Sequence, residues 1–521
     1  MDTSSPPRPA LTKFDVLSTT ALELRDRLEN GTLTSVDIAT AYLAQIERHN
    51  PKLNLVISLR NRKQLLADAR QRDEERKAGN VRSPFHGIPF LAKDAFATVP
   101  SLGLPTTVGS FALLVSKPRA NAAATDALIA AGMISIGKSN LSEFCGCKGN
   151  VRWSAVGGQG QSPWVEGGLK DGDPPRGPTA PGGSSTGSAH AVAAGFVPLS
   201  IGTESCGSLI TPAGRAGVYT LKLTPETVNT QGICKITVEW DTIGGFARSV
   251  EEVAILSDLL PKIAEAGEGR QPLTTSLRKD FTGLRIEFVD PEKWAIEDDA
   301  READPYLPGE IKSQFEWAMK SIKEAGGEVV YPVELPAYET FFHEGQPLLG
   351  LITNAEVKIC IKEYIASLES SSVKSLDDII EFNKANPILE LPSDNPEQDY
   401  LIAAAKSSVE ENDLPFLRNL YYKKAGRDGL ERTIREHKLD VIVAPVDSPA
   451  HSSETPAATV PLGYAKINGH PFGAQLLALR GHEGKLIEVM SAWEAVLFPT
   501  IRVPDLRWAD KWGKGDGLQS W

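Results

Sequence analysis

The chain has 521 residues, of which 41% are hydrophobic and 23% charged, and its net charge is −12. This length suits two to four ordinary domains or one large catalytic domain with insertions. Proteins that bind nucleic acid through its phosphates need many Lys and Arg side chains, so an acidic chain without a basic run argues against that partner. Because no run approaches 18 consecutive apolar residues, we expect no transmembrane segment.

The five cysteines are too few for a disulfide scaffold, and their odd number suits a reducing compartment. Cys145 and Cys147 have the wrong spacing for a zinc ribbon and no matching Cys/His pair follows them, so we expect no metal. The first residues, MDTSSPPRPALTKFDVL, contain no apolar run of the length found in signal peptides. We therefore expect a cytoplasmic protein.

The predicted elements begin after a polar, proline-rich stretch, residues 1–15, which we interpret as a flexible N-terminal arm. An N-cap pattern at Thr34 starts a helix. Apolar residues then recur every four positions between 38 and 46, which is the spacing of one helix face. Asn50-Pro51 predicts the end of this helix, because the residue before a proline disfavours helical backbone.

Between residues 85 and 260, short apolar runs alternate with glycine and proline turns and helical patches, which favours a mixed α/β architecture. Buried strands are predicted at 87–93, 133–138, 196–203 and 218–224, and helices at 122–132 and 249–260. Residues 262–435 are more charged and are predicted to be mostly helical, with long loops. The apolar run 439–446 predicts a return to the core as a strand, and a last helix follows near 483–497.

One loop contains a nucleophile motif, since Gly183-Ser184-Ser185-Thr186-Gly187 matches G-x-S-x-G. That motif needs a strand directly before its serine, and the preceding DGDPPRGPTAPGG is too rich in proline for a central strand. Ser185 is therefore a poor candidate for the nucleophile of such a turn. The loop also lacks the lysine of a phosphate-binding loop.

A second loop rich in serine and glycine, residues 202–214, follows a predicted strand. Ser184 in the first loop and Ser208 in the second bracket one supersecondary unit, so both loops can lie at the same edge of a sheet. Backbone N–H groups at a tight turn such as Gly207-Ser208 suit the binding of an oxyanion.

A serine nucleophile also needs a base that accepts its proton. Six histidines lack the local context of a catalytic triad and are interpreted as structural, namely His86, His190, His343, His451, His470 and His482. A lysine can serve if burial lowers its pKa. Lys93, Lys138 and Lys222 each end an apolar run, and the sequence pattern does not choose among them.

Residues 182–224, GGSSTGSAHAVAAGFVPLSIGTESCGSLITPAGRAGVYTLKLT, resemble the signature of the amidase signature family. FHGIPFLAKDAF resembles the family's lysine strand, and WSAVGGQGQSPW is similar to fungal-type members. The likeness covers most of 20–262 and 436–500. It implies one large α/β domain over 16–521, with a mixed central β-sheet covered by helices on both faces. Residues 262–435 would then be a more variable region that covers the substrate.

The resemblance also implies a Ser–cis-Ser–Lys triad. Matched residue by residue, Ser208 falls on the family's nucleophile, Ser184 on the bridging serine and Lys93 on the base. In the family, the peptide bond before the bridging serine is cis. The G-x-S-x-G match at Ser185 would then be a coincidence of composition, and Ser185 would hold the loop by hydrogen bonding.

The nucleophile loop supplies the remaining implied contacts. The backbone N–H groups of Ser205, Cys206, Gly207 and Ser208 would receive the oxyanion. The sequence departs from the family pattern here, because Cys206-Gly207-Ser208 stands in place of Gly-Gly-Ser and Glu204 in place of Asp. Ile210 also replaces a common arginine. These departures predict an altered pocket, with specificity set near Cys206 and Trp153 and by region 262–435.

The function implied by the resemblance is hydrolysis of a small-molecule carboxamide to an acid and ammonia or an amine, through an acyl-enzyme and without a cofactor. Alternatives are the ammonia-generating A subunit of a tRNA-dependent amidotransferase, and an inactive family member that acts as a binding protein. A hydrolase of lipid amides would need an exposed apolar helix pair within 270–400. A homodimer is one of the assemblies that we consider for this chain.

Overall fold

The computed structural model describes residues 13–149, 152–263, 271–294, 302–446, 454–500 and 502–511. Residues 1–12 of the predicted arm and His451 lie outside this range. The last residues of the predicted arm pack against the molecule, because Phe14 is buried with its ring centroid 5.8 Å from that of Tyr42.

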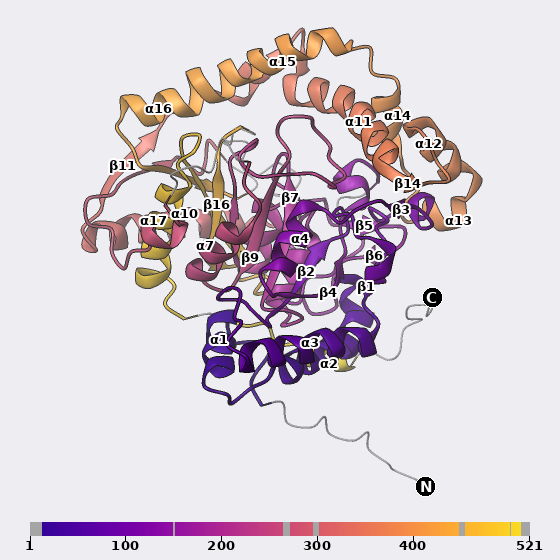
Figure 1. The fold of residues 1–521 in the computed structure, drawn as a ribbon. Helices are drawn as coiled ribbons and strands as arrows, with labels where there is room; N and C mark the ends of the chain where they lie inside the picture. The colour runs from indigo at the N-terminus through magenta and orange to yellow at the C-terminus, as the bar shows by residue number, and fades with distance from the viewer. Residues whose placement is uncertain are drawn as a thin grey trace.

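A mixed sheet of eleven strands forms the centre of the molecule (Figure 1). In spatial order its strands are β1 (Val56–Leu59), β4 (Ile134–Ser139), β2 (Pro89–Lys93), β7 (Leu199–Glu204), β9 (Thr242–Ala247), β8 (Tyr219–Lys222), β16 (Ala457–Tyr464), β17 (Pro471–Leu477), β15 (Val441–Pro445), β10 (Arg285–Val289) and β11 (Glu328–Val333). β2 is parallel to β4 and β7, and β10 is parallel to β11 and β15. The remaining neighbours are antiparallel.

This arrangement confirms the predicted α/β fold with a mixed central sheet. The four strands predicted between residues 85 and 260 correspond to β2, β4, β7 and β8, each within three residues of its predicted bounds. The strand predicted at 439–446 contains β15. β10 and β11 were not predicted, although they extend the same sheet. Glu287 interrupts the apolar residues of β10, and β11 contains Pro332, so neither segment has the sequence pattern of a buried strand.

Helices flank the sheet. α5 (Thr186–Ala193) packs on β2, β4 and β7, and α6 (Ile210–Ala216) packs on β8, β16 and β17. α7 (Val250–Leu259) packs on β8 and β9, and α17 (Glu483–Val496) packs on β15 and β16. The other helices outside the cap are α1 (Ala21–Glu29), α2 (Ser35–Leu53), α3 (Arg62–Lys77), α4 (Ala123–Ala130), α10 (Leu307–Glu324) and α18 (Arg507–Lys511). Over the described residues, none of the helices combines the length and the apolar character needed to cross a bilayer.

Helix α2 begins as predicted and ends later. Thr34 is its N-cap and takes part in a capping box. The predicted end at Asn50-Pro51 is wrong, because the helix continues to Leu53 with Pro51 inside its last turn. A proline there removes a single backbone donor near the helix end, which costs less than in the middle. The helix stops at Asn54, whose backbone is left-handed (φ 48°).

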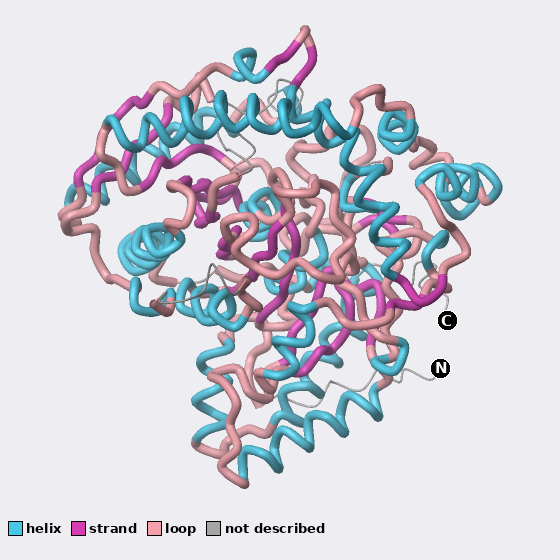
Figure 2. Tube along the Cα trace, turned by 45° about the horizontal axis from the view of Figure 1, so that its top comes forward, coloured by secondary structure: helices cyan, strands magenta, loops and turns pink. Residues whose placement is uncertain are grey.

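A layer of helices, residues 348–436, lies over one side of the molecule, and we call it the cap (Figure 1, orange). Figure 2, with the top of Figure 1 turned forward, shows its helices running across the loops and strands beneath them. The cap contains α11 (Leu348–Ser367), α12 (Leu376–Ala385), α13 (Pro387–Glu390), α14 (Asp399–Ala405), α15 (Leu414–Tyr421), the π-helical segment η7 (Tyr422–Leu430) and α16 (Glu431–Glu436). Three short strand pairs lie outside the central sheet, namely β3 (Lys117–Pro118) with β14 (Leu368–Ser370), β5 (Trp153–Ser154) with β6 (Gly158–Gln159), and β12 (Phe342–His343) with β13 (Gln346–Pro347).

A buried ionic cluster fastens one end of the cap to the rest of the chain. The Lys148 ammonium contacts the carboxylates of Glu143 and Glu390, and all three side chains are fully buried. Glu390, from α13, also accepts hydrogen bonds from Ser110 Oγ (2.9 Å) and from the N–H of Phe111 (2.7 Å). Burial, together with the nearby Glu390, holds the pKa of Glu143 well above its usual range. Two carboxylates thus compete for one ammonium in a site without solvent.

Removal of that ammonium should destabilise the fold strongly. We expect Lys148→Met to lower the free energy of unfolding by about 3–5 kcal/mol at pH 7, because it leaves uncompensated buried carboxylates. The loss should shrink as the pH falls toward 5, because a proton then neutralises Glu143, whose folded pKa is raised. Urea denaturation followed by circular dichroism would measure both effects.

Lys384→Met is the matched control, because Lys384 pairs with Glu381 on the exposed surface of the same cap. An exposed pair contributes about 0–1 kcal/mol, so this variant should unfold almost like the wild type. Equal behaviour of the two variants would contradict the role given to the buried cluster.

Candidate active site

Two parallel neighbouring strands bring the predicted catalytic residues together. Lys93 is the last residue of β2, and Glu204 is the last residue of β7. Both strands therefore end at the same edge of the sheet. Ser208 lies in the loop that follows β7, and Ser184 lies in the loop that precedes α5.

A continuous chain of hydrogen bonds joins these side chains. Lys93 Nζ lies 2.7 Å from Ser184 Oγ, which donates to Ser208 Oγ at 2.8 Å. The peptide bond between Gly183 and Ser184 is cis. Lys93 and Ser184 are buried, whereas Ser208 is partly accessible. The chain thus runs from an amine in the interior to a hydroxyl that a substrate can reach.

The environment of Lys93 favours its neutral form. Its side chain is fully buried, and this burial lowers the pKa of the ammonium. Thr203 Oγ1 accepts a further hydrogen bond from Lys93 Nζ at 2.9 Å. Lys93 is therefore held by two hydroxyl groups rather than by a carboxylate at hydrogen-bonding distance.

The two other candidate lysines are also buried, and within the described part of the chain neither hydrogen-bonds to Ser184 or Ser208. Lys138 Nζ donates to the Phe96 carbonyl and to Thr106 Oγ1 and lies 3.6 Å from Asp94. Lys222 Nζ donates to the carbonyl of Thr455 at 2.6 Å. Burial lowers the pKa of each of the two to about 8, so a lowered pKa alone does not distinguish the three lysines. The contact with Ser184 distinguishes Lys93.

The loop that carries Ser208 presents free backbone donors. Gly207 has a left-handed backbone (φ 95°), a conformation that glycine adopts without strain. Within the described part of the chain, the N–H groups of Cys206, Gly207 and Ser208 donate no hydrogen bond. Glu204 anchors the end of the loop, because its carboxylate accepts from the N–H groups of Leu209 (2.6 Å) and Ile210 (3.0 Å). The loop is thus fixed while its donors remain unused.

Comparisons with known proteins identify the family of this chain. The family model described as Amidase matches residues 37–452, which is most of the chain.

The chain belongs to the amidase family.

Two relatives named as amidases are each 29% identical to this chain. The Arabidopsis thaliana protein aligns over 92% of this chain and 90% of its own length, and the Schizosaccharomyces pombe protein over 94% and 87%. The solved structure of the native peptide amidase from Stenotrophomonas maltophilia is 31% identical, with a TM-score of 0.79 over 94% of this chain and 99% of that one. These matches confirm the expected family and an enzyme that hydrolyses amide C–N bonds.

Ser185 and Ser205 join the loop that carries Ser208 to neighbouring groups of this amidase. Ser185 is buried, no strand directly precedes it, and its Oγ donates to the Thr203 carbonyl at 3.2 Å. Its N–H donates to the carbonyl of Ser208 at 3.2 Å. Ser205 Oγ donates to Asp241 at 2.7 Å. Both serines connect the nucleophile loop to its surroundings.

Sequence reasoning missed Thr203 and Asp241, although both contact the predicted residues. Asp241 also accepts from the N–H and the hydroxyl of Thr237, each at 2.7 Å, so it ties a neighbouring loop to Ser205. The sequence did contain a signal for Thr203, because this residue directly precedes Glu204 within residues 182–224, which resemble the family signature. No local sequence pattern pointed to Asp241.

Among the described residues, no group of three or more His, Cys, Asp or Glu side chains is arranged to hold a metal ion.

Cys206 offers a direct test of access to this loop. Its side chain is exposed, whereas those of Cys145, Cys147, Cys234 and Cys360 are buried. The surrounding protein nevertheless desolvates the thiol and, with Glu204 nearby, raises its pKa to about 12.

We expect iodoacetamide to modify Cys206 before the other cysteines of the native protein. The rate should rise about tenfold per pH unit between pH 7 and 9, because only the thiolate reacts and its fraction grows tenfold per unit below the pKa. Timed quenching and peptide mapping would measure it, with Cys206→Ser as the unlabelled control. Earlier modification of any buried cysteine would contradict the placement of Cys206.

Proposed function

We propose that this chain hydrolyses the carboxamide of a small-molecule substrate through Lys93, Ser184 and Ser208. The observation that carries the proposal is the continuous hydrogen-bond chain from the buried Lys93 amine through Ser184 to the accessible Ser208 hydroxyl. A serine hydroxyl becomes a nucleophile when its proton has a path to a base, and this chain supplies the path.

The first half of the reaction forms an acyl-enzyme. Neutral Lys93 takes the proton of Ser184, and Ser184 takes the proton of Ser208. Ser208 Oγ then bonds to the amide carbonyl carbon, and the carbonyl oxygen gains negative charge. The unused N–H groups of Cys206, Gly207 and Ser208, together with that of Ser205, are the proposed donors to this oxyanion.

The second half releases the products. The proton on Lys93 returns through Ser184 to the amide nitrogen as the C–N bond breaks, so ammonia or an amine leaves. Water then gives a proton to the same relay and adds to the acyl carbon, which frees the acid and restores Ser208. The protons pass only among the three side chains, the leaving amine and water, so the proposal requires no cofactor.

The alternatives predict different behaviour of the isolated chain. An amidotransferase A subunit works within an assembly, so its ammonia release would depend on a partner protein. An inactive binding protein would show no chemistry that changes when Ser208 is replaced. The relatives named as amidases align with nearly the whole chain, which supports the autonomous hydrolase.

Labelling with a fluorophosphonate probe tests the nucleophile without knowledge of the substrate. Intact mass and peptide mapping should show one adduct, on Ser208, which disappears in Ser208→Ala. Labelling of Lys93→Ala should be slower by about 10²–10⁴-fold, the usual contribution of a general base. Labelling of Ser185 instead would refute the assigned triad, and ammonia release from a panel of primary amides would follow a positive result.

The pH dependence of labelling tests the base. Lys93 is active when neutral, and burial places its pKa below the usual value of 10.5. The labelling rate should therefore rise with pH and reach a plateau before pH 10.5, because deprotonation is then complete. Lys93→Arg should be slow and show no such rise, since a guanidinium stays protonated. A wild-type rate that still climbs at pH 10.5 would contradict a desolvated Lys93.

A further inference from the structure

A third side chain completes the surroundings of the Lys93 amine. The buried thiol of Cys145 contacts both Lys93 and the hydroxyl of Thr203. The thiol proton is directed elsewhere, because Cys145 Sγ donates to the carbonyl of Cys234 at 3.9 Å. The lone pairs of the sulfur are therefore the part of the thiol that Lys93 and Thr203 meet.

A turn with an unusual backbone holds Cys145 in this position. The turn is η3 (Glu143–Gly146), in which Phe144 and Cys145 are both left-handed, with φ of 47° and 57°. Residues other than glycine seldom adopt this conformation, and it persists only where the surroundings fix it. One such restraint is the N–H of Phe144, which donates to the carbonyl of Val108 at 3.0 Å. The turn thus keeps the thiol against Lys93.

The same short segment also holds the bridging serine. The N–H of Ser142, directly before η3, donates to the carbonyl of Ser184 at 3.0 Å. Ser142 Oγ in turn accepts from the N–H of Arg152 at 2.6 Å. Residues 142–145 therefore contact two members of the proposed triad, Ser184 through the backbone and Lys93 through the thiol.

The charged and titratable groups near Lys93 and Cys145 come from three other elements. They are Glu204 at the end of β7, Asp241 before β9 and Tyr364 on α11 of the cap. Burial raises the pKa of the Cys145 thiol and holds that of Tyr364 well above its usual range, so both are neutral at pH 7. The thiol is thus a neutral partner of Lys93 and not a counter-ion.

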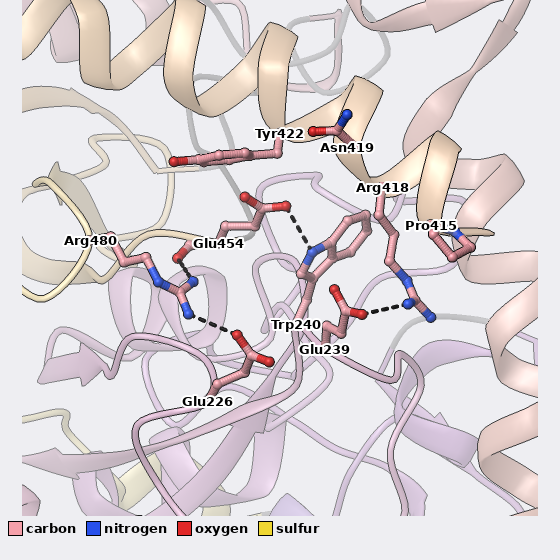
Figure 3. A pocket seen from close by; sticks show the side chains of 9 residues that line it. All are labelled: Glu226, Glu239, Trp240, Pro415, Arg418, Asn419, Tyr422, Glu454 and Arg480. Carbon is pink, nitrogen blue, oxygen red and sulfur yellow. Dashed lines mark hydrogen bonds and ion pairs between the residues drawn. The ribbon is translucent and has the colours of Figure 1, made fainter. Parts of the chain in front are cut away.

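The cavity nearest to Asp241 in the sequence does not open onto this amine. Trp240, directly before Asp241, lines a cavity of about 370 Å³ together with Tyr422 of the cap (Figure 3). Neither Lys93 nor Cys145 belongs to its lining. Protein groups therefore determine which form of the Lys93 amine is favoured.

The hydrogen-bonding capacity of these groups suits a neutral amine. An ammonium has three N–H donors, whereas a neutral amine has two and a lone pair. Ser184 Oγ at 2.7 Å and Thr203 Oγ1 at 2.9 Å are the close partners of Lys93 Nζ. A third N–H would meet the carbonyl of Thr203 only at 3.5 Å, or the sulfur of Cys145, which is a weak acceptor.

We infer that Cys145 is a positioning residue of the proposed relay, whose sulfur packs against Lys93 while offering its ammonium form only a weak acceptor. An oxygen in the same place would satisfy the third N–H and favour the charged amine. The inference rests on the proposed function, because it assigns Cys145 to the base of that relay.

The first experiment measures how fast a fluorophosphonate labels Ser208 between pH 6 and 10.5. Cys145→Ser supplies an oxygen acceptor, so the midpoint of the pH profile should rise by about one unit. The labelling rate at pH 7 should then fall about tenfold, while the rate at the high-pH plateau stays within about threefold of the wild type. Cys145→Ala supplies no acceptor, so its midpoint should not rise.

Cys360→Ser is the matched control, since Cys360 is a buried cysteine of α11 and undergoes the same chemical change. It should keep the wild-type profile. The inference is overturned if the midpoint of Cys145→Ser is unchanged, since a merely structural role would alter the plateau alone. It is also overturned if that midpoint falls, because the thiol would then be a thiolate that stabilises the ammonium.

The second experiment does not depend on the nucleophile. If Lys93 binds a proton more readily in folded Cys145→Ser, falling pH stabilises that folded state. We therefore expect the stability of Cys145→Ser relative to Cys360→Ser to rise from pH 10 to pH 7, measured by urea denaturation. Both variants lose one buried thiol, so ionisation of that thiol in the unfolded chain cancels.

The two experiments separate this inference from the proposed function. A relative stability without the expected trend would overturn the role of Cys145, even if Ser208 is labelled as proposed. Absence of Ser208 labelling in the wild type and all variants, together with the expected stability trend, would overturn the proposed function alone.

Discussion

The desolvation of one lysine is the constraint on which the site depends. An ammonium in the interior is unfavourable unless a carboxylate pairs with it, and Lys93 has hydroxyl partners at hydrogen-bonding distance instead. Its position at the end of β2, between two parallel neighbours, keeps solvent away. Burial thus lowers the pKa of this amine and favours the neutral form that the proposed relay requires.

The cap is held at two distant points, and both reach the proposed active site. At one end, Glu390 joins the cluster with Glu143 and Lys148, next to the serine loops. At the other end, Trp240 packs in the small hydrophobic core of the cap, with its ring 4.9 Å from that of Tyr421. Trp240 directly precedes the aspartate that holds Ser205. The same residues that seat the cap therefore also fix the loops beneath it.

Local patterns predicted β2, β4, β7, β8, β15 and both serine loops because these features depend on short stretches of sequence. The choice of Lys93 over Lys138 and Lys222 needed the family resemblance, since all three lysines lie at or next to the end of a buried strand. Strand order decides which lysine faces Ser184, and strand order is not a local property. The contact between Lys148 and Glu390 spans 242 residues, so no window of the sequence contained it. β10 and β11 were missed because Glu287 interrupts the apolar residues of β10 and Pro332 lies within β11.

The position of the cap in the chain has a consequence for how such enzymes diverge. β11 and β15 are both parallel to β10, and residues 334–440, which include the cap, connect them. Parallel strands always require a crossover connection, so this part of the chain is an enlarged version of a link that the fold needs anyway. Doubling the length of a flexible connection costs only about 0.6 kcal/mol in closure entropy. Insertions and replacements here can therefore alter the cap while β2, which carries Lys93, and β7, which leads into the loop with Ser208, keep their register.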